Sequence, residues 1–187
     1  MYYLLGKKES FAIEIEETTV PQEWKSTDLW IKSAIWINNT RIGDWEDANI
    51  IGPLVGAMFR ISTKYDTFWL EELEDLTCYN LYLTIHPNYN DPSNFFNLTE
   101  EEQDKLIPFG KFLLSWGENF DSWGLCMVYK KGVCKFLWVH TPLGNDESYE
   151  VKNNIQCFDI KLEYVQQVYE ELIKAIPNEH WPRLIPK

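Results

Sequence analysis

The sequence predicts one α+β domain in which helices pack on a central, mainly antiparallel β-sheet. Its 187 residues fall within the usual length of a single domain. Hydrophobic residues make up 45% of the chain, enough for a substantial core, which excludes wholesale disorder. Both strand-like and helix-like patterns occur, and no repeat, low-complexity stretch or linker separates them. We therefore expect residues 1–187 to form one domain.

Two strands and the start of a third are predicted near the N-terminus. In "FAIEIEE", residues 11–17, isoleucine and glutamate alternate, which is typical of a strand with one buried face. A second strand is expected over residues 29–37. Asn38 and Asn39 suit a two-residue hairpin turn, because asparagine tolerates positive φ. The return strand would then begin at residues 41–42.

The next part of the chain shows helical spacing and then alternation. Apolar residues at intervals of three and four predict a helix over residues 49–63, with Pro53 in its first turn. A second helix is expected over residues 66–76. The stretch "CYNLYLTIH", residues 78–86, alternates and therefore predicts a strand.

A loop and a further helix are expected in the middle of the chain. Residues 87–97 are rich in Pro, Asn and Asp, which favours a loop. Thr99 lies three residues before Glu102, the spacing of a capping box, so a helix is predicted to begin there. Pro108 and Gly110 interrupt it.

The clearest hairpin spans residues 123–140, with its turn at Lys131 and Gly132. The expected cross-strand pairs are Tyr129 with Cys134 and Leu125 with Trp138. Both faces of this hairpin are largely apolar, so it should lie in the middle of the sheet, covered on both sides. A strand over residues 155–160 and a helix over residues 162–176 are predicted to follow.

The charge of the chain is strongly negative. It has 29 Asp and Glu against 17 Lys and Arg, a net charge of -12. Binding to nucleic-acid phosphates or to anionic membranes needs positive charge, so both are disfavoured. A basic partner is favoured, because opposite fields steer association.

The N-terminus and the cysteines both favour the cytoplasm. No signal peptide precedes the first strand, and no run reaches the roughly 18 apolar residues of a membrane span. The four cysteines form no Cys-x-x-Cys pair and are too spread out for a zinc site. Cys126 and Cys134 fall on the two arms of one hairpin, where we expect neighbouring buried thiols rather than a disulfide.

No pattern of catalytic residues, metal ligands or cofactor contacts stands out, so we expect no enzyme activity, metal or cofactor. The three histidines are scattered without metal-ligand spacing. Asp44, Glu46 and Asp47 lack the glycine and the distal glutamate of a calcium loop. Two alternatives remain open on the residues alone: a small hydrolase that uses clustered carboxylates, and a generic acidic interaction module.

Three blocks of sequence resemble a family of bacterial immunity proteins. They are "FAIEIE" at residues 11–16, "IWINNTRIGDWED" at residues 35–47 and "ENFDSWGLCMVYKKGVCKFLWVH" at residues 118–140. In this order they are similar to the immunity protein 42 family of polymorphic toxin systems, which include contact-dependent inhibition. The resemblance implies an antitoxin without catalytic activity. Such a protein binds the C-terminal toxin domain of a related system and blocks it by protein–protein inhibition.

Together with the acidic character, the resemblance implies a basic cognate toxin of nuclease type. The resemblance then suggests two partner-binding patches. These are Asp44, Trp45, Glu46 and Asp47, with the tryptophan as anchor, and Glu71, Glu72, Glu74 and Asp75. Specificity would come from a few buried anchors rather than from total charge.

Overall fold

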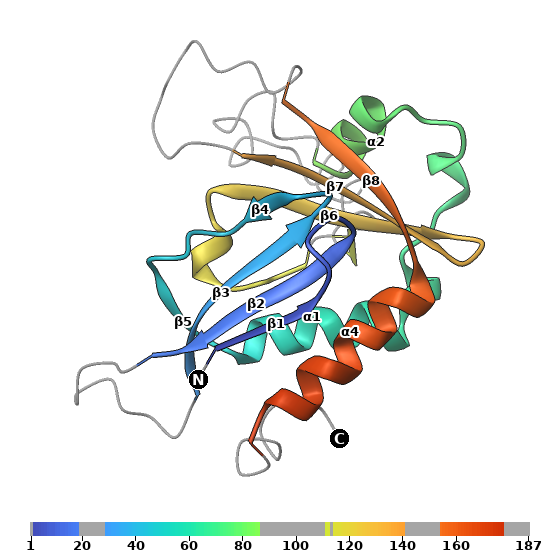
Figure 1. The fold of residues 1–187 in the computed structure, drawn as a ribbon. Helices are drawn as coiled ribbons and strands as arrows, with labels where there is room; N and C mark the ends of the chain where they lie inside the picture. The colour runs from blue at the N-terminus through green and yellow to red at the C-terminus, as the bar shows by residue number, and fades with distance from the viewer. Residues whose placement is uncertain (1, 19–28, 87–110, 113, 141–153, 178–187) are drawn as a thin grey trace, which may run out of the picture.

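The structure is a computed structural model and confirms the predicted α+β class (Figure 1). It describes residues 2–18, 29–86, 111–112, 114–140 and 154–177. The loop predicted over residues 87–97 and the helix predicted from Thr99 lie outside the described residues. Among the helices of the described part, none has the length and apolar character needed to cross a membrane.

Five antiparallel strands form the first sheet. They are β1 (Tyr2–Gly6), β2 (Phe11–Glu17), β3 (Trp30–Ile37), β4 (Thr40–Ile42) and β5 (Ala48–Ile50). Their order is β1-β2-β3-β4, and β5 pairs with the other half of β3. The hairpin turn is confirmed, with φ of 49° at Asn38 and 63° at Asn39. Positive φ at both positions matches the right-handed twist of the flanking strands.

A second, three-stranded sheet contains β6 (Trp123–Lys130), β7 (Val133–His140) and β8 (Gln156–Lys161) in that order. The predicted register is confirmed, since Tyr129 lies opposite Cys134 and Leu125 opposite Trp138. The prediction that the whole hairpin lies in the middle of one sheet is wrong in part. Only β7 is central, whereas β6 has one partner strand within the described residues.

The described helices include three α-helices and three short 3₁₀ helices. They are α1 (Gly52–Thr63), α2 (Cys78–Ile85), α4 (Leu162–Ala175), η2 (Tyr65–Thr67), η3 (Glu71–Leu73) and η7 (Glu118–Phe120). The first helix starts later than predicted, because residues 48–50 pair with β3 instead. The helix predicted over residues 66–76 is wrong. Two separate 3₁₀ turns, which pack Phe68 and Leu73 into the core, replace it.

The strand predicted over residues 78–86 is also wrong, because this segment is helix α2. Its N-cap Thr77 accepts a hydrogen bond from the backbone N–H of Asn80, at 3.2 Å. Buried Leu81, Tyr82 and Ile85 share one face at helical spacing. A short apolar run fits either period, so the cap and the surface available for packing decided its structure.

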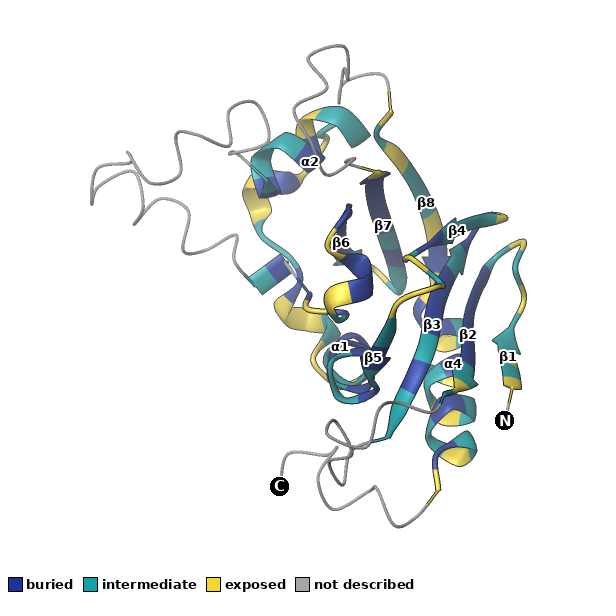
Figure 2. Cartoon of the chain, turned by 90° about the vertical axis from the view of Figure 1, so that its left-hand side faces the viewer, coloured by how far each residue is buried: buried dark blue, intermediate teal, exposed yellow. Residues whose placement is uncertain are grey.

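The core lies between the two sheets and is closed by helices (Figure 2). Phe11 of β2 stacks on Phe136 of β7, with ring centroids 5.2 Å apart. Helix α4 packs against β1, β2 and α1. Its approach is so close that a Cβ at Gly6, which has φ of 87°, would lie 2.8 Å from the side chain of Val168. Helix α2 lies on the other face of the second sheet, beside β7.

The cysteines are arranged differently from the expectation. Cys78 of α2 and Cys157 of β8 form a disulfide across 79 residues of sequence. Cys126 and Cys134 are free and buried, as predicted. They lie on opposite faces of the hairpin. Cys134 pairs with Tyr129, which is three positions from Cys126, and residues an odd number of positions apart on a strand point to opposite faces.

Candidate partner-binding surface

The loop between β4 and β5 carries the first predicted patch, Asp44, Trp45, Glu46 and Asp47. The backbone N–H of Asp44 donates to the carbonyl oxygen of Asn119 at 2.7 Å. The carboxylate of Asp44 accepts a hydrogen bond from the Ser122 hydroxyl at 2.8 Å. At Gly43, with φ of 105°, a Cβ would lie 2.8 Å from the ring of Phe120. The loop is therefore attached closely to residues 118–122.

Asn119 of η7 makes this attachment, and the sequence did not single it out. It is 1% exposed, and its side-chain amide donates to the carbonyl oxygen of Ser33 at 2.7 Å. Its side-chain oxygen accepts from the amide of Asn49 at 3.1 Å. Donor and acceptor are thus both satisfied inside the protein, which is what burial of an asparagine requires. Nothing in the local pattern distinguishes it from a surface asparagine.

Bringing η7 against the loop gathers acids that are far apart in the sequence. Glu118 and Asp121 flank Asn119 and are exposed, as are Asp44, Glu46 and Asp47. We call these five residues the acidic edge: Asp44, Glu46, Asp47, Glu118 and Asp121. Figure 1 shows η7 as the short yellow helix on the same side of the molecule as β4 and β5. The side chain of Glu46 is 87% exposed although it pairs with Lys32 at 3.1 Å.

Trp45 is held against the protein rather than projecting from it. It is half-buried, and the guanidinium carbon of Arg41 lies 4.6 Å from the centroid of its ring. The ring of Tyr2 meets it edge-on, with centroids 6.4 Å apart. Trp45 therefore provides a fixed, partly covered surface beside the acids.

A hollow of about 670 Å³ adjoins the acidic edge. Three indole rings and one phenyl ring form much of its wall, and two carboxylates of the edge border it. These residues are Trp30, Trp116, Trp123, Phe120, Glu118 and Asp121. Figure 2 shows this side of the molecule, where β5, the start of α1 and β6 come together. The hollow joins residues from three separate parts of the chain: Trp30, residues 49–53 and residues 114–125.

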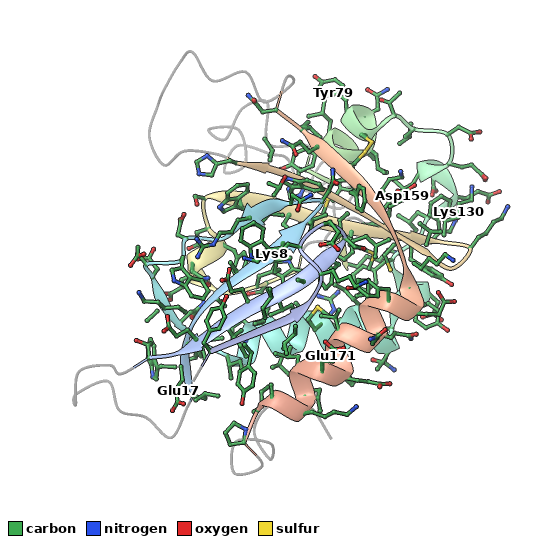
Figure 3. The ribbon with its side chains drawn as sticks, viewed as in Figure 1. Lys8, Glu17, Tyr79, Lys130, Asp159 and Glu171 are labelled. Carbon is green, nitrogen blue, oxygen red and sulfur yellow. A yellow bond between two sulfur atoms is a disulfide. The ribbon has the colours of Figure 1, made fainter. Side chains whose placement is uncertain are left out.

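The outer face of the five-stranded sheet carries a buried acid that already has partners. The carboxylate of Glu14 accepts hydrogen bonds from the Tyr2 hydroxyl, at 2.5 Å, and from the indole of Trp36, at 2.8 Å. Lys8 and Arg41 each lie 3.8 Å from it, and Lys8 is visible over this sheet in Figure 3. Burial raises the pKa of Glu14, but these hydrogen bonds and charges lower it more, so it lies below its ordinary value. Glu14 is therefore a structural charge.

The second predicted patch, Glu71, Glu72, Glu74 and Asp75, lies on η3 and the residues after it. All four residues are exposed. Figure 1 shows this green segment on the side of the molecule opposite β4 and β5, so the two patches do not form one surface. The Glu74 carboxylate is hydrogen-bonded by Lys130, and this bond and its charge lower the pKa of Glu74.

Lysines are interleaved with the second patch. Lys130 also lies over the ring of Trp69, with its ammonium 4.9 Å from the ring centroid. A hollow of about 320 Å³ here is bordered by Asp75, Lys130, Lys131 and Lys135. Figure 3 shows Lys130 and Asp159 at the same end of the second sheet. Lys130 therefore offsets the charge of Glu74, whereas Lys135 is paired with Asp159.

Within the described ranges, no three side chains of His, Cys, Asp and Glu are grouped as a metal site would need. His86 is the C-cap of α2 and stacks on Tyr82, with ring centroids 4.4 Å apart. Burial lowers the pKa of His86 to about 4, so its ring is neutral near pH 7. His140 ends β7 beside Trp123, and His180 lies outside the described residues.

The fold and this surface define a binding protein, with exposed charge on an α+β scaffold. The model of the family "Immunity protein 42" matches residues 1–175, and the chain belongs to this family. The resemblance found in the sequence is thereby confirmed. No curated protein matches the sequence.

One solved structure is similar in fold, the crystal structure of CdiI from Burkholderia dolosa AUO158. The alignment covers 93% of this chain and 100% of that one, with a TM-score of 0.58 and 13% sequence identity. At this identity the likeness concerns the fold. Family membership makes the chain a toxin-neutralising immunity protein, an inhibitor rather than an enzyme, which removes the hydrolase alternative.

Proposed function

We propose that this immunity protein neutralises a basic, nuclease-type toxin domain in the bacterial cytoplasm by binding it through the acidic edge. The observation that carries this proposal is the attachment of the β4–β5 loop to η7. It places five carboxylates of one sign on one surface. The backbone that carries these carboxylates is already held by hydrogen bonds, so less conformational entropy is lost on binding.

The charge of the edge suits a basic partner in two ways. Glu46, Asp47, Glu118 and Asp121 are exposed, so their field reaches an approaching partner and accelerates association at low salt. Trp45 lies beside them and supplies apolar contact area with little rotamer freedom left to lose. The similar CdiI structure agrees with a role in contact-dependent inhibition.

The second patch is the weaker candidate for the same partner. Its acids lie among Lys130, Lys131 and Lys135, which reduce the attraction for a basic surface. We therefore assign Glu71, Glu72, Glu74 and Asp75 a secondary role in the proposal. A contact there would add affinity without setting the association rate.

Co-expression and association kinetics test the proposal. The candidate toxin domain for this test is the C-terminal domain of the protein encoded immediately upstream. It should stop growth alone, and this chain should restore growth. Glu46→Lys with Asp47→Lys and Asp121→Lys should slow association about tenfold or more at low salt, because steering falls with the reversed charge. Asp44 is left unchanged, because its carboxylate accepts the bond from Ser122.

Two further variants complete this experiment. Glu9→Lys with Glu170→Lys changes exposed acids away from the edge and should leave the association rate within about twofold. Glu71→Lys with Glu72→Lys should have an intermediate effect. A harmless upstream domain, or an edge variant that associates at the wild-type rate, would overturn the proposal.

A further inference from the structure

We propose that the tryptophan-lined hollow beside the acidic edge receives an arginine side chain of the toxin domain. The inference rests on the proposed function, because it names one contact within the same interface. The hollow is the one lined by Trp30, Trp116 and Trp123, with Glu118 and Asp121 at its border. The acidic edge would attract the partner, and the hollow would hold it.

The hollow is large enough to receive a side chain. Its volume of about 670 Å³ is in the range of small-ligand pockets and exceeds what one long side chain occupies. Trp116 and Phe120 are only 3% and 4% exposed, so they form its inner wall. Trp30 and Trp123 are half-buried and keep part of their rings accessible. The hollow is open to solvent on one side, so a side chain that enters would lose part of its contact with water.

The aromatic rings and the carboxylates of the wall favour a cation. The faces of indole rings attract positive charge, and tryptophan is the strongest of the aromatic side chains in this respect. Glu118 and Asp121 add two carboxylates beside the rings. An anionic group would meet repulsion from both carboxylates, so a nucleic acid or an acidic peptide does not fit.

Arginine fits this combination better than lysine. Its planar guanidinium stacks on aromatic faces, is more weakly hydrated than an ammonium, and forms paired hydrogen bonds with carboxylates. The protein uses the same pairing elsewhere, since the guanidinium of Arg41 lies over Trp45. Buried arginine and tryptophan side chains are also the residues that most often dominate the affinity of an interface.

The wall is rigid before any partner arrives. Gly117 has φ of 117°, and a Cβ there would overlap the side-chain amide of Asn49. Asn119, two residues after Gly117, is hydrogen-bonded to both Ser33 and Asn49. The segment that carries Trp116, Glu118 and Asp121 is therefore fixed to the first sheet. A preformed hollow avoids the entropy cost of assembling these groups on binding.

The first experiment uses a small probe and does not need the toxin. The indole N–H signals of the protein are recorded by NMR during titration with the capped tripeptide acetyl-Gly-Arg-Gly-amide. The signals of Trp30, Trp116 and Trp123, assigned with single Trp→Phe variants, should shift. Acetyl-Gly-Gln-Gly-amide should leave them in place. Shifts that are equal for the two peptides, or confined to other tryptophans, would overturn the inference.

The second experiment uses the toxin domain. Glu118→Gln with Asp121→Asn and Trp30→Leu should weaken toxin affinity at least tenfold, mainly through faster dissociation, because the arginine loses a ring face and both carboxylates. Glu9→Gln with Glu170→Gln removes the same number of charges elsewhere and should leave the affinity unchanged. Circular dichroism confirms that each variant is folded.

The results separate the two proposals. If the wild-type chain binds and neutralises the toxin but the hollow variant binds as tightly, the arginine contact is wrong. The proposed function then stands only if Glu46→Lys with Asp47→Lys, which lie outside the hollow, still slows association. If the wild-type chain does not bind the toxin, the proposed function fails. The peptide titration then still decides whether the hollow binds arginine.

Discussion

The two acidic patches have similar density of charge in the sequence but different surroundings in the structure. The acidic edge is backed by Asn119 and gains two carboxylates from η7. The second patch lies on a 3₁₀ turn, shares its surface with lysines, and is backed by α2 and the disulfide of Cys78. The comparison shows that the field of a patch depends on which residues the fold brings beside it.

Loss of the disulfide, which joins α2 to β8, is expected to have the largest effect on stability. Cys78→Ser with Cys157→Ser frees a loop of 79 residues. Loop entropy alone then lowers the free energy of unfolding by about 4 kcal/mol. Urea denaturation measures this loss. Toxin association at the acidic edge should keep its wild-type rate, and a slower rate would show that the two regions are coupled.

Asn119→Ala is expected to lower the free energy of unfolding by about 3 kcal/mol, because the carbonyl of Ser33 and the amide of Asn49 stay buried without this partner. It should also slow toxin association, since the β4–β5 loop loses its support. Asn80→Ala changes an exposed asparagine of α2 and serves as the control. A variant with wild-type association kinetics would mean that the loop does not need η7.

The smallest of these effects is a pH dependence of stability that comes from His86, at the end of α2. The pKa of His86 is about 4 in the fold and 6.5 in the unfolded chain, because burial disfavours the charged ring. Below pH 6.5 the unfolded chain binds the additional proton, so this group lowers stability as the pH falls from 6.5 to 4 and has no further effect below. We expect a loss of about 2 kcal/mol, reduced by the partial exposure of the ring.

Denaturation of His86→Phe across this pH range isolates the histidine. The phenyl ring retains the stacking on Tyr82 but cannot take up a proton. The difference in the free energy of unfolding between variant and wild type should therefore grow as the pH falls. A constant difference would mean that His86 titrates normally in the folded protein.

Local patterns predicted the elements whose geometry depends only on residues close together in the sequence. The strand at residues 11–17, the turn at Asn38 and Asn39, and the register of the hairpin from 123 to 140 are all confirmed. Period-two alternation and turn residues determine such features within a few positions. Residues 78–86 show the limit, because their apolar run suits either period and only the neighbouring sheet selects the helix.

The candidate site was predictable only in part. Asp44, Glu46 and Asp47 are neighbours in the sequence, so their cluster was visible there. Glu118 and Asp121 join them through the buried bonds of Asn119, and no sequence spacing records such a bond. The three tryptophans of the hollow are spread from residue 30 to residue 123 and meet only where β5, α1 and β6 converge.

By itself, the sequence determined the α+β class, the family, the acidic character and most of the strands. Each of these depends on composition or on contacts between near neighbours. Tertiary structure alone decided which acids lie near one another, that Lys130 pairs with Glu74, that Cys78 meets Cys157, and that a hollow opens beside the edge. The physical reason is that charge, burial and cavities depend on distances in space, which the folded core sets between residues far apart in the chain.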